Sequence, residues 1–520
     1  MISHYNLLRM KYLKYKRLLL SFVFGMMTLA TTAQISPLDY GLREATTGIE
    51  RYQALYKAHS EAISRGTTVT YEGITSLEIE LPTDFKCIPV GRYTDFGGVV
   101  FYVTNRSRHD ALFVMNDWGT SVDLPKEMVD GRDFRSVSAL ADGYKMLILN
   151  DKHPWTERQG YGYRVYRKDI LLLHNGRSES GTIAPWNTEA TELSASYINI
   201  DTAQKVFKGL TLLRSKESTF RTYCLTMNGQ YNVLIENVFV STPRSRMIDD
   251  RVFGVYDCMR ITFRDVRVAG TYSGYGRWRD YGYAFSMSNV RDAKFELVSA
   301  DGNWGVFGTN NLANTTLISC DINRFDIHCY GRDALLERCT LRQRQTQFSS
   351  MYGTVTFDSC RFVDCIPVRI RSSYNAYTPF DINMLNCTFE LTPRHHSLVN
   401  VMLLDTADNS RPELNSKCWP NLQVINMKVI APRNVRSLDL FEPTGTLSEL
   451  DKPVGYLSKV TVKDLHMVRP NGKAADIPCQ LSTKKFKTAN NLQFIDCLAI
   501  PSTSSKEIKN ANNLQLIIVD

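Results

Sequence analysis

The sequence of 520 residues lacks most of the short motifs that assign a protein to a functional class. Its 12 cysteines include no Cys-x-x-Cys pair, which argues against a zinc site. No segment dense in arginine and lysine and no RNA-binding signature is present, so we expect no nucleic-acid partner. No linker rich in glycine, proline or serine divides the chain, and we therefore predict one elongated domain behind a leader.

An apolar run long enough to span a bilayer is also missing at the N-terminus. The run from Leu18 to Ala30 is short, and five basic residues without an acid precede it. Thr31-Thr32-Ala33 then supplies small residues for cleavage, and no cysteine follows for lipid attachment. We predict a signal peptide at 1–33, a mature chain that starts at Gln34 without a membrane span, and export to the periplasm or the extracellular space. A signal peptide retained as an anchor is the alternative.

The net charge gives little information about partners. The formal charge of +9 falls to +4 when the five basic residues of the leader are removed. A mild basic excess suits an acidic polysaccharide as partner, but an excess of this size is also ordinary.

A short cassette repeats through the second half of the chain. Most copies have Asn, Asp or Ser before a small apolar anchor, often Cys, and a second apolar residue two places later. The anchors are Val238, Val266, Val298, Cys320, Cys339, Cys360, Cys387, Met427, Leu465 and Cys497. The shortest steps between anchors are 19 to 22 residues, which suits one coil of a solenoid and is too short for a propeller blade.

The composition of the cassette predicts its local structure. The runs are β-branched and aromatic, which favours strands over helices. Asn237, Asp265 and their equivalents tolerate the left-handed backbone conformation, so they mark a tight bend between two strands of each coil. The anchors should then form one inward column. Its cysteines, Cys320, Cys339, Cys360 and Cys387, are predicted to be a buried ladder of small apolar side chains rather than disulfides.

With these repeats the chain resembles the right-handed parallel β-helix of the pectate-lyase-like superfamily, over roughly residues 206–500. The resemblance implies an all-β solenoid of about ten or more coils. An amphipathic pattern over 48–63 predicts a helix that caps the first coil. The predicted parts are the signal peptide at 1–33, the capping-helix region at 34–65, N-terminal coils with irregular loops at 66–205, the main β-helix at 206–500, and an end strand or tail at 501–520. Within the N-terminal coils at 66–205, the segment 116–200 is less regular and suggests long loops or a small insertion.

One candidate site is the stretch 271–283, which is crowded with aromatic residues and arginines. Aromatic faces pack on the apolar face of sugar rings, and guanidinium groups hold carboxylates or sulfates. A loop that packs its rings on itself is the alternative. The predicted substrate-binding residues in this stretch are Tyr275, Arg277, Trp278, Arg279 and Asp280.

A second candidate site combines residues of two successive coils. Asp301 and Trp304 belong to one coil, and Arg324, Asp326 and His328 follow in the next. Because side chains alternate along a strand, Asp326 and His328 should leave the same face. A carboxylate two residues from a histidine, with an arginine beside them, offers acid–base chemistry and a charge clamp. A buried polar pair that points inward is the alternative.

Other patterns give weaker evidence for a functional site. Arg369 and Arg371 place two guanidinium groups on one strand face and are predicted to bind substrate. Together with Asp249-Asp250 they are similar to part of the polygalacturonase motif. The Gly-His-Gly of that family is missing, however, and His328 lies several coils away, so we reject that assignment. Asp280, Asp301 and Asp326 could stack on successive coils, but the neighbouring arginines disfavour calcium, and we predict no cofactor.

These observations predict an exported carbohydrate-active protein that acts on an acidic glycan. As a lyase, it would use His328 or an arginine to take a proton while Arg324 or Arg279 neutralises the substrate carboxylate. As a glycoside hydrolase, it would use Asp301 and Asp326 as the paired carboxylates. The alternatives are a non-catalytic glycan-binding or adhesion protein and a purely structural solenoid.

Overall fold

The computed structural model describes residues 34–103, 111–158, 163–186, 191–214, 224–241, 251–269, 283–300, 305–343, 345–371, 380–402, 420–444, 460–477 and 479–480. The predicted signal peptide and C-terminal tail lie outside these residues. Thirty of the strands join one sheet through consistently parallel pairings, and five form a separate antiparallel sheet. No helix in the described part of the chain is long and apolar enough to cross a membrane.

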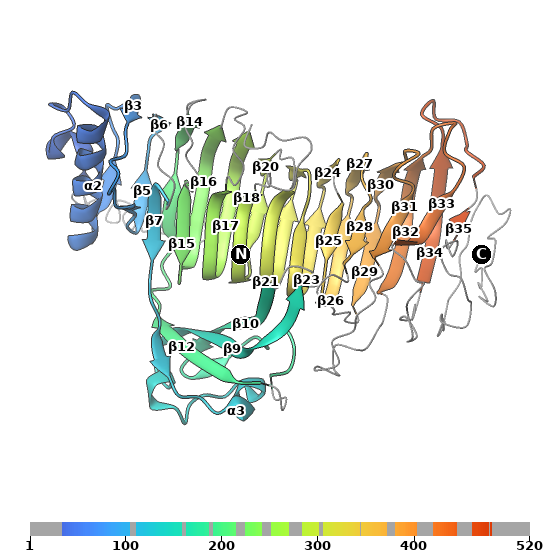
Figure 1. Cartoon of the computed structure of the whole chain (residues 1–520), viewed down its shortest axis with the longest axis horizontal. Coiled ribbons are helices and arrows are strands. Elements are labelled where there is room, and N and C mark those ends of the chain that lie inside the picture. The colour runs from blue at the N-terminus through green and yellow to red at the C-terminus, as the bar shows by residue number, and fades with distance from the viewer. Residues whose placement is uncertain are drawn as a thin grey trace, which may run out of the picture.

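Parallel strands follow one another along a single row in Figure 1. The first seven are β1 (Gln34–Ile35), β2 (Thr68–Thr70), β3 (Ser76–Ile79), β4 (Ile88–Pro89), β5 (Tyr93–Asp95), β6 (Val100–Val103) and β7 (Phe113–Asn116). The next nine are β13 (Lys205–Lys208), β14 (Thr211–Arg214), β15 (Leu225–Asn228), β16 (Tyr231–Ser241), β17 (Arg251–Ala269), β18 (Tyr283–Arg291), β19 (Lys294–Glu296), β20 (Ser299–Ala300) and β21 (Gly305–Ile318).

The row continues with fourteen further strands. Its strands are β22 (Asp321–Ile322), β23 (Asp326–Glu337), β24 (Thr340–Arg342), β25 (Thr346–Phe348), β26 (Met351–Asp358), β27 (Arg361–Val363), β28 (Val368–Ile370), β29 (Asp381–Leu385), β30 (Thr388–Glu390), β31 (Ser397–Met402), β32 (Asn421–Ile430), β33 (Leu438–Thr444), β34 (Val460–Val468) and β35 (Cys479–Gln480). Each strand pairs with its equivalent in the next coil, as Val238 does with Val266 and Thr340 with Arg361. The predicted all-β, parallel β-helix architecture is confirmed.

The bend predicted from the cassette is also confirmed. Asn237, Asp265, Asn386, Asn426 and Asp464 all have φ between 50° and 55°. The amide of Asn426 donates to Oδ1 of Asn386 over 2.9 Å, so neighbouring bends are tied side chain to side chain. Leu297, Ser319, Arg338 and Ser359 adopt the same left-handed conformation at the equivalent position.

The interior of the solenoid is a continuous apolar core. Four predicted anchors, Cys320, Cys339, Cys360 and Cys387, are buried free thiols that donate weakly to backbone carbonyls, so the ladder of unpaired cysteines is confirmed. A second column consists of phenylalanine rings with centroids 5.0 to 6.1 Å apart. Its members are Phe253, Phe285, Phe307, Phe325 and Phe348.

Helical segments are few among the residues that the structure describes. They are η1 (Pro37–Tyr40), α2 (Gly48–Ser64), α3 (Lys126–Gly131) and η2 (Ser138–Leu140). Helix α2 begins with a capping box, in which Thr47 accepts from the Glu50 amide and Glu50 accepts from the Thr47 amide. It packs against β1 to β4 at the N-terminal end of the row, with Leu55 and Ala58 fully buried (Figure 1).

The region 117–204 is not built of coils, and of the two alternatives expected for 116–200 it contains the insertion. The strands β8 (Thr120–Val122), β9 (Tyr144–Arg158), β10 (Tyr163–His174), β11 (Arg177–Ser178) and β12 (Leu193–Asn199) form an antiparallel sheet in the order β11-β10-β9-β12-β8. Because β7 pairs directly with β15, the chain leaves the solenoid after Asn116 and returns at Lys205. The sheet is thus an insertion that lies beside the row of strands (Figure 1).

Candidate functional site

The strand β23 positions the residues of the second predicted site. Phe325 and Ile327 belong to the apolar core, so Asp326 and His328 leave the opposite, outer face of the strand. His328 Nε2 lies 2.8 Å from Asp326 Oδ2, which shows that the two side chains meet as predicted. The face does not point into the core, yet the Asp326 side chain is fully buried and that of His328 is 16% exposed.

Stacking of the coils brings further polar residues next to this pair. Asp326 is in register with Gln347 of β25, and Gln347 is in register with Arg369 of β28. Gln347 Oε1 accepts from Arg324 over 2.5 Å and from Arg371 over 3.2 Å. Gln347 therefore holds two guanidinium groups that come from different coils.

The charged groups that meet here shift one another's pKa. We call the whole set the cluster, and its members are Arg324, Asp326, His328, Gln347, Arg369 and Arg371. Burial raises the pKa of the Asp326 carboxyl, but Arg324, His328 and Arg371 outweigh it and bring the pKa down to about 2. Arg324 donates directly to Oδ2 of this carboxylate. Asp326 is therefore ionised at any pH near neutrality and acts as a fixed acceptor.

His328 is held neutral. Burial lowers the pKa of its imidazole, and Arg371 and Arg324 lower it further against the opposing effect of Asp326. Because the Asp326 carboxylate can only accept, the Nε2 that faces it carries the proton, and the other ring nitrogen carries the lone pair. A neutral imidazole with a fixed tautomer can accept a proton near neutral pH.

A tyrosine completes the cluster. The hydroxyl of Tyr283, at the start of β18, lies 3.3 Å from His328 Nε2, and the two rings meet edge to face with centroids 6.0 Å apart. The ring of Tyr283 crosses Gly308 of the intervening coil, where an added Cβ would come within 2.8 Å of it. Any side chain at Gly308 would displace the tyrosine from the histidine.

Three guanidinium groups converge on the cluster. Arg324 and Arg371 are buried and Arg369 is half-buried. The pKa of Arg369 is lowered by its burial and then by Arg371 and Arg324, so the local potential is positive enough to disfavour another cation. Such a potential favours an anionic ligand, and planar guanidinium groups suit a carboxylate in particular.

The predicted residues divide into two sets. The structure brings Arg324, Asp326, His328, Arg369 and Arg371 together. The other predicted site residues, Tyr275, Arg277, Trp278, Arg279, Asp280, Asp301 and Trp304, lie outside the described residues. Across the described ranges, no group of three His, Cys, Asp or Glu side chains is arranged to hold a metal ion.

Two residues of the cluster were not predicted. Gln347 gives no sequence signal, because only the coil-to-coil register places it between Asp326 and Arg369. Tyr283 ends the aromatic stretch 271–283, but nothing in the pattern separates it from the other tyrosines of that stretch.

The inserted sheet docks beside the cluster. Tyr330, two residues after His328 on β23, donates its hydroxyl to Asp169 Oδ2 of β10 over 3.0 Å. The buried Asp169 also accepts from Trp186 Nε1 over 2.9 Å and pairs with Arg291 of β18 over 3.3 Å. The insertion is thus fixed to the same strands that carry Tyr283 and His328.

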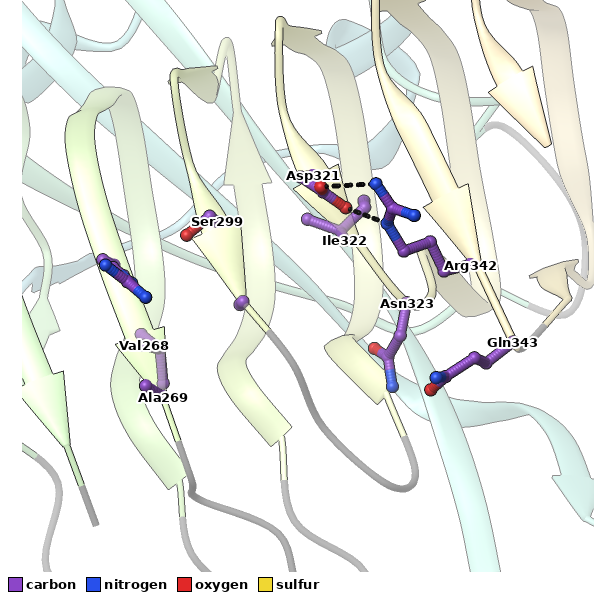
Figure 2. A pocket seen from close by; sticks show the side chains of 10 residues that line it. Val268, Ala269, Ser299, Asp321, Ile322, Asn323, Arg342 and Gln343 are labelled. Atoms are coloured by element: carbon purple, nitrogen blue, oxygen red, sulfur yellow. Dashed lines mark hydrogen bonds and ion pairs between the residues drawn. The ribbon is translucent and has the colours of Figure 1, made fainter. Parts of the chain in front are cut away.

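A separate hollow of about 260 Å³ lies beside the cluster. It is lined by residues of β17, β20, β22 and β24 and by residues that directly follow these strands. Figure 2 shows the ion pair of Asp321 and Arg342 on one side of this hollow, with Asn323 and Gln343 extending toward each other on the other side. Asn323 directly precedes Arg324 in the chain, so the hollow and the cluster are neighbours.

Comparison with known proteins adds no assignment from sequence: no family model matches the chain, and no curated protein matches it. Among solved structures, the chain is similar to the tailspike of Acinetobacter baumannii bacteriophage AP22 in complex with a capsular saccharide, at 10% identity and a TM-score of 0.46 over 89% of this chain and 79% of that one. A tailspike of Pseudomonas phage LKA1 is similar at 13% identity and a TM-score of 0.46, over 83% and 81%. The A-module of a mannuronan C-5 epimerase from Azotobacter vinelandii is similar at 10% identity and a TM-score of 0.46, over 89% and 100%.

Proposed function

We propose that this chain is a carbohydrate-active enzyme that cleaves an acidic polysaccharide by β-elimination, as a polysaccharide lyase. The observation that carries the proposal is the contact of a neutral histidine with both a buried, ionised aspartate and a tyrosine hydroxyl, beside three arginines. Those groups are the base, the acid and the charge clamp that elimination next to a carboxylate requires.

In the proposed reaction, the half-buried Arg369 binds the uronate carboxylate, and the buried Arg324 and Arg371 add positive charge behind it. Their charge stabilises the enolate-like anion that forms when the proton on the adjacent carbon leaves. His328 takes that proton, and Asp326 stabilises the imidazolium that results. The electron pair forms a carbon–carbon double bond and expels the glycosidic oxygen, to which Tyr283 donates a proton.

The same geometry disfavours the hydrolase. A glycosidase needs one carboxyl group with a raised pKa as the acid, and a second carboxylate that reaches the sugar. The Asp326 carboxyl has a pKa of about 2, no exposed surface and a direct bond from Arg324. It supports the histidine rather than meeting a substrate.

The finer organisation of the chain is part of the proposal. We infer a right-handed solenoid of about ten or more coils, whose first coil is capped by α2, exported after removal of residues 1–33. N-terminal sequencing of the exported protein tests the last point, because the proposal requires the mature chain to begin at Gln34.

The experiment that tests the function is a screen of the mature protein against acidic and neutral polysaccharides. New ultraviolet absorbance from a carbon–carbon double bond, together with new reducing ends on an acidic polymer, would support the lyase. Reducing ends without that absorbance would establish a hydrolase instead. Binding of an acidic polymer without any cleavage would favour the non-catalytic glycan-binding alternative.

A further inference from the structure

The hollow beside the cluster is lined by a buried side-chain amide that has no hydrogen-bond partner in the described part of the chain. Asn323 is 4% exposed, and neither its Oδ1 nor its Nδ2 has a hydrogen-bond partner among the described residues. Leaving a buried donor and a buried acceptor unsatisfied destabilises the folded chain. A ligand that both donates and accepts, as a pair of sugar hydroxyls does, would remove that destabilisation.

A guanidinium group lies on the same hollow. Arg267 is exposed at the end of β17, with its guanidinium carbon 5.6 Å from the centre of the Phe239 ring, and no described carboxylate pairs with it. Arg342 differs, because Asp321 holds its guanidinium through two bonds of 2.7 and 2.9 Å. The hollow thus offers one guanidinium group to an anion, beside an unsatisfied amide.

The floor and the size of the hollow suit a sugar ring. Val268, Ala300 and Ile322 belong to the apolar core, and their backbone forms a flat parallel ladder beneath the polar side chains. The volume of the hollow is about 260 Å³, whereas the volume of a site for a drug-sized molecule is roughly 300–1,000 Å³. Asn323 and Asp326 are three residues apart, so their Cα atoms are separated by at most about 10 Å.

We propose that this hollow is a second, non-catalytic subsite that binds an acidic sugar unit, with Arg267 at its carboxylate and the Asn323 amide at its ring hydroxyls. The inference rests on the proposed function, because it assigns the occupant to the same acidic glycan that the cluster cleaves. The subsite would bind a unit beyond the one at His328, so only chains long enough to reach both would benefit.

The test compares KM and kcat of Arg267→Gln and Asn323→Leu with those of the wild type, on short and long oligosaccharides of the acidic polymer identified in the screen. We expect a rise in KM of about tenfold on long chains in both variants, with kcat and the values for short chains within about twofold. Arg361→Gln is the matched control. Arg361 occupies the same outward register two coils beyond Asp321 and pairs with Glu390, outside the hollow.

The possible results separate the two proposals. If the wild type cleaves the acidic polymer and both hollow variants keep its KM on long chains, the subsite is wrong and the lyase stands. An equal rise in KM for Arg361→Gln would also overturn the subsite, because it would reflect general charge. If no acidic polymer is bound or cleaved by the wild type, the lyase and the subsite fall together. Asn323→Leu could fail as a test by displacing Arg324, its neighbour in the chain. In that case the KM of Arg267→Gln decides, because Arg267 lies on another coil.

Discussion

At the scale of single residues, Leu297 is an apolar residue at the bend position that Asn, Asp or Ser occupies in most coils. It occupies the left-handed position of the bend with φ of 55°, and its side chain is 60% exposed. Most residues with a Cβ are destabilised there by roughly 1–2 kcal/mol, whereas the short polar side chains of Asn and Asp hydrogen-bond locally and tolerate the conformation. The bend residues of the adjacent coils are Asp265 and Ser319.

We therefore expect Leu297→Asn to raise the free energy of unfolding by about 1 kcal/mol. Urea denaturation followed by circular dichroism measures the change. Leu297→Ala is the control, because it removes the exposed apolar side chain but lacks the polar group with which asparagine supports the left-handed conformation. A gain for alanine equal to that for asparagine would show that backbone strain is not the cause.

His59 on α2 is a buried histidine with both ring nitrogens occupied. Nδ1 lies 3.1 Å from the Pro89 carbonyl and Nε2 lies 2.8 Å from the Tyr71 hydroxyl, so the neutral ring donates to the first and accepts from the second. Burial lowers the pKa of this imidazole to about 4. In the unfolded chain this imidazole takes up a proton near its ordinary pKa of 6.5. Acidic pH therefore stabilises the unfolded state relative to the folded state.

The stability that His59 contributes should be complete above about pH 6.5 and should be lost as the pH falls towards 4. Its size is about 3 kcal/mol, from 1.36 kcal/mol for each pKa unit. Comparing urea midpoints of the wild type and His59→Gln across this range isolates the effect, since other titrating groups cancel in the difference. A pH-independent difference between the two proteins would refute the assignment.

At the scale of elements, a buried carboxylate is one of the links between the inserted sheet and the solenoid, beside bonds such as that from the Lys168 amide to Asn311. Asp169 of β10 bonds the side chains of Trp186, Arg291 and Tyr330, and only the last two belong to the solenoid. Removing one partner from a buried ion pair typically costs about 3–5 kcal/mol, because the other charge stays buried. Losing the Asp169 carboxylate should weaken the docking of the inserted sheet rather than the pairing of the parallel strands.

We expect Asp169→Ala to make residues 117–204 sensitive to limited proteolysis while the parallel strands stay resistant. Mass spectrometry of the early fragments locates the cuts. Asp142→Ala removes an exposed carboxylate of the same insertion and serves as the control. Unchanged fragments from Asp169→Ala would mean that the apolar contacts of the sheet suffice to dock it.

The elements that the sequence predicts are those that repeat. The bend at Asn237 and the cysteine ladder were predictable because the same spacing recurs coil after coil, and a parallel stack gives every copy the same environment. The insertion has no such repeat, so β9 and β10 could not be paired in advance. Asp326 and His328 were placed on one face by simple alternation, whereas Gln347 depends on a register that outward-facing residues do not encode.

At the scale of the whole molecule, the solenoid brings a base, an acid and three arginines together within a span of five successive coils. Tyr283, His328, Gln347 and Arg369 come from β18, β23, β25 and β28, and only lateral stacking makes them neighbours. Because each coil pairs rigidly with the next, the positions of these groups are set by the core beneath them. Catalysis by this cluster would therefore depend on the register of the whole stack.

The most direct test of this account is the rate of double-bond formation, read as ultraviolet absorbance, with wild type, His328→Gln and Asp326→Asn on the same acidic polysaccharide. The account predicts absorbance for the wild type and a fall in kcat of about 10²–10⁴ for both variants, because one removes the base and the other its orienting carboxylate. Thermal melting of the variants provides the check that they fold. Undiminished absorbance from folded His328→Gln would contradict the central claim.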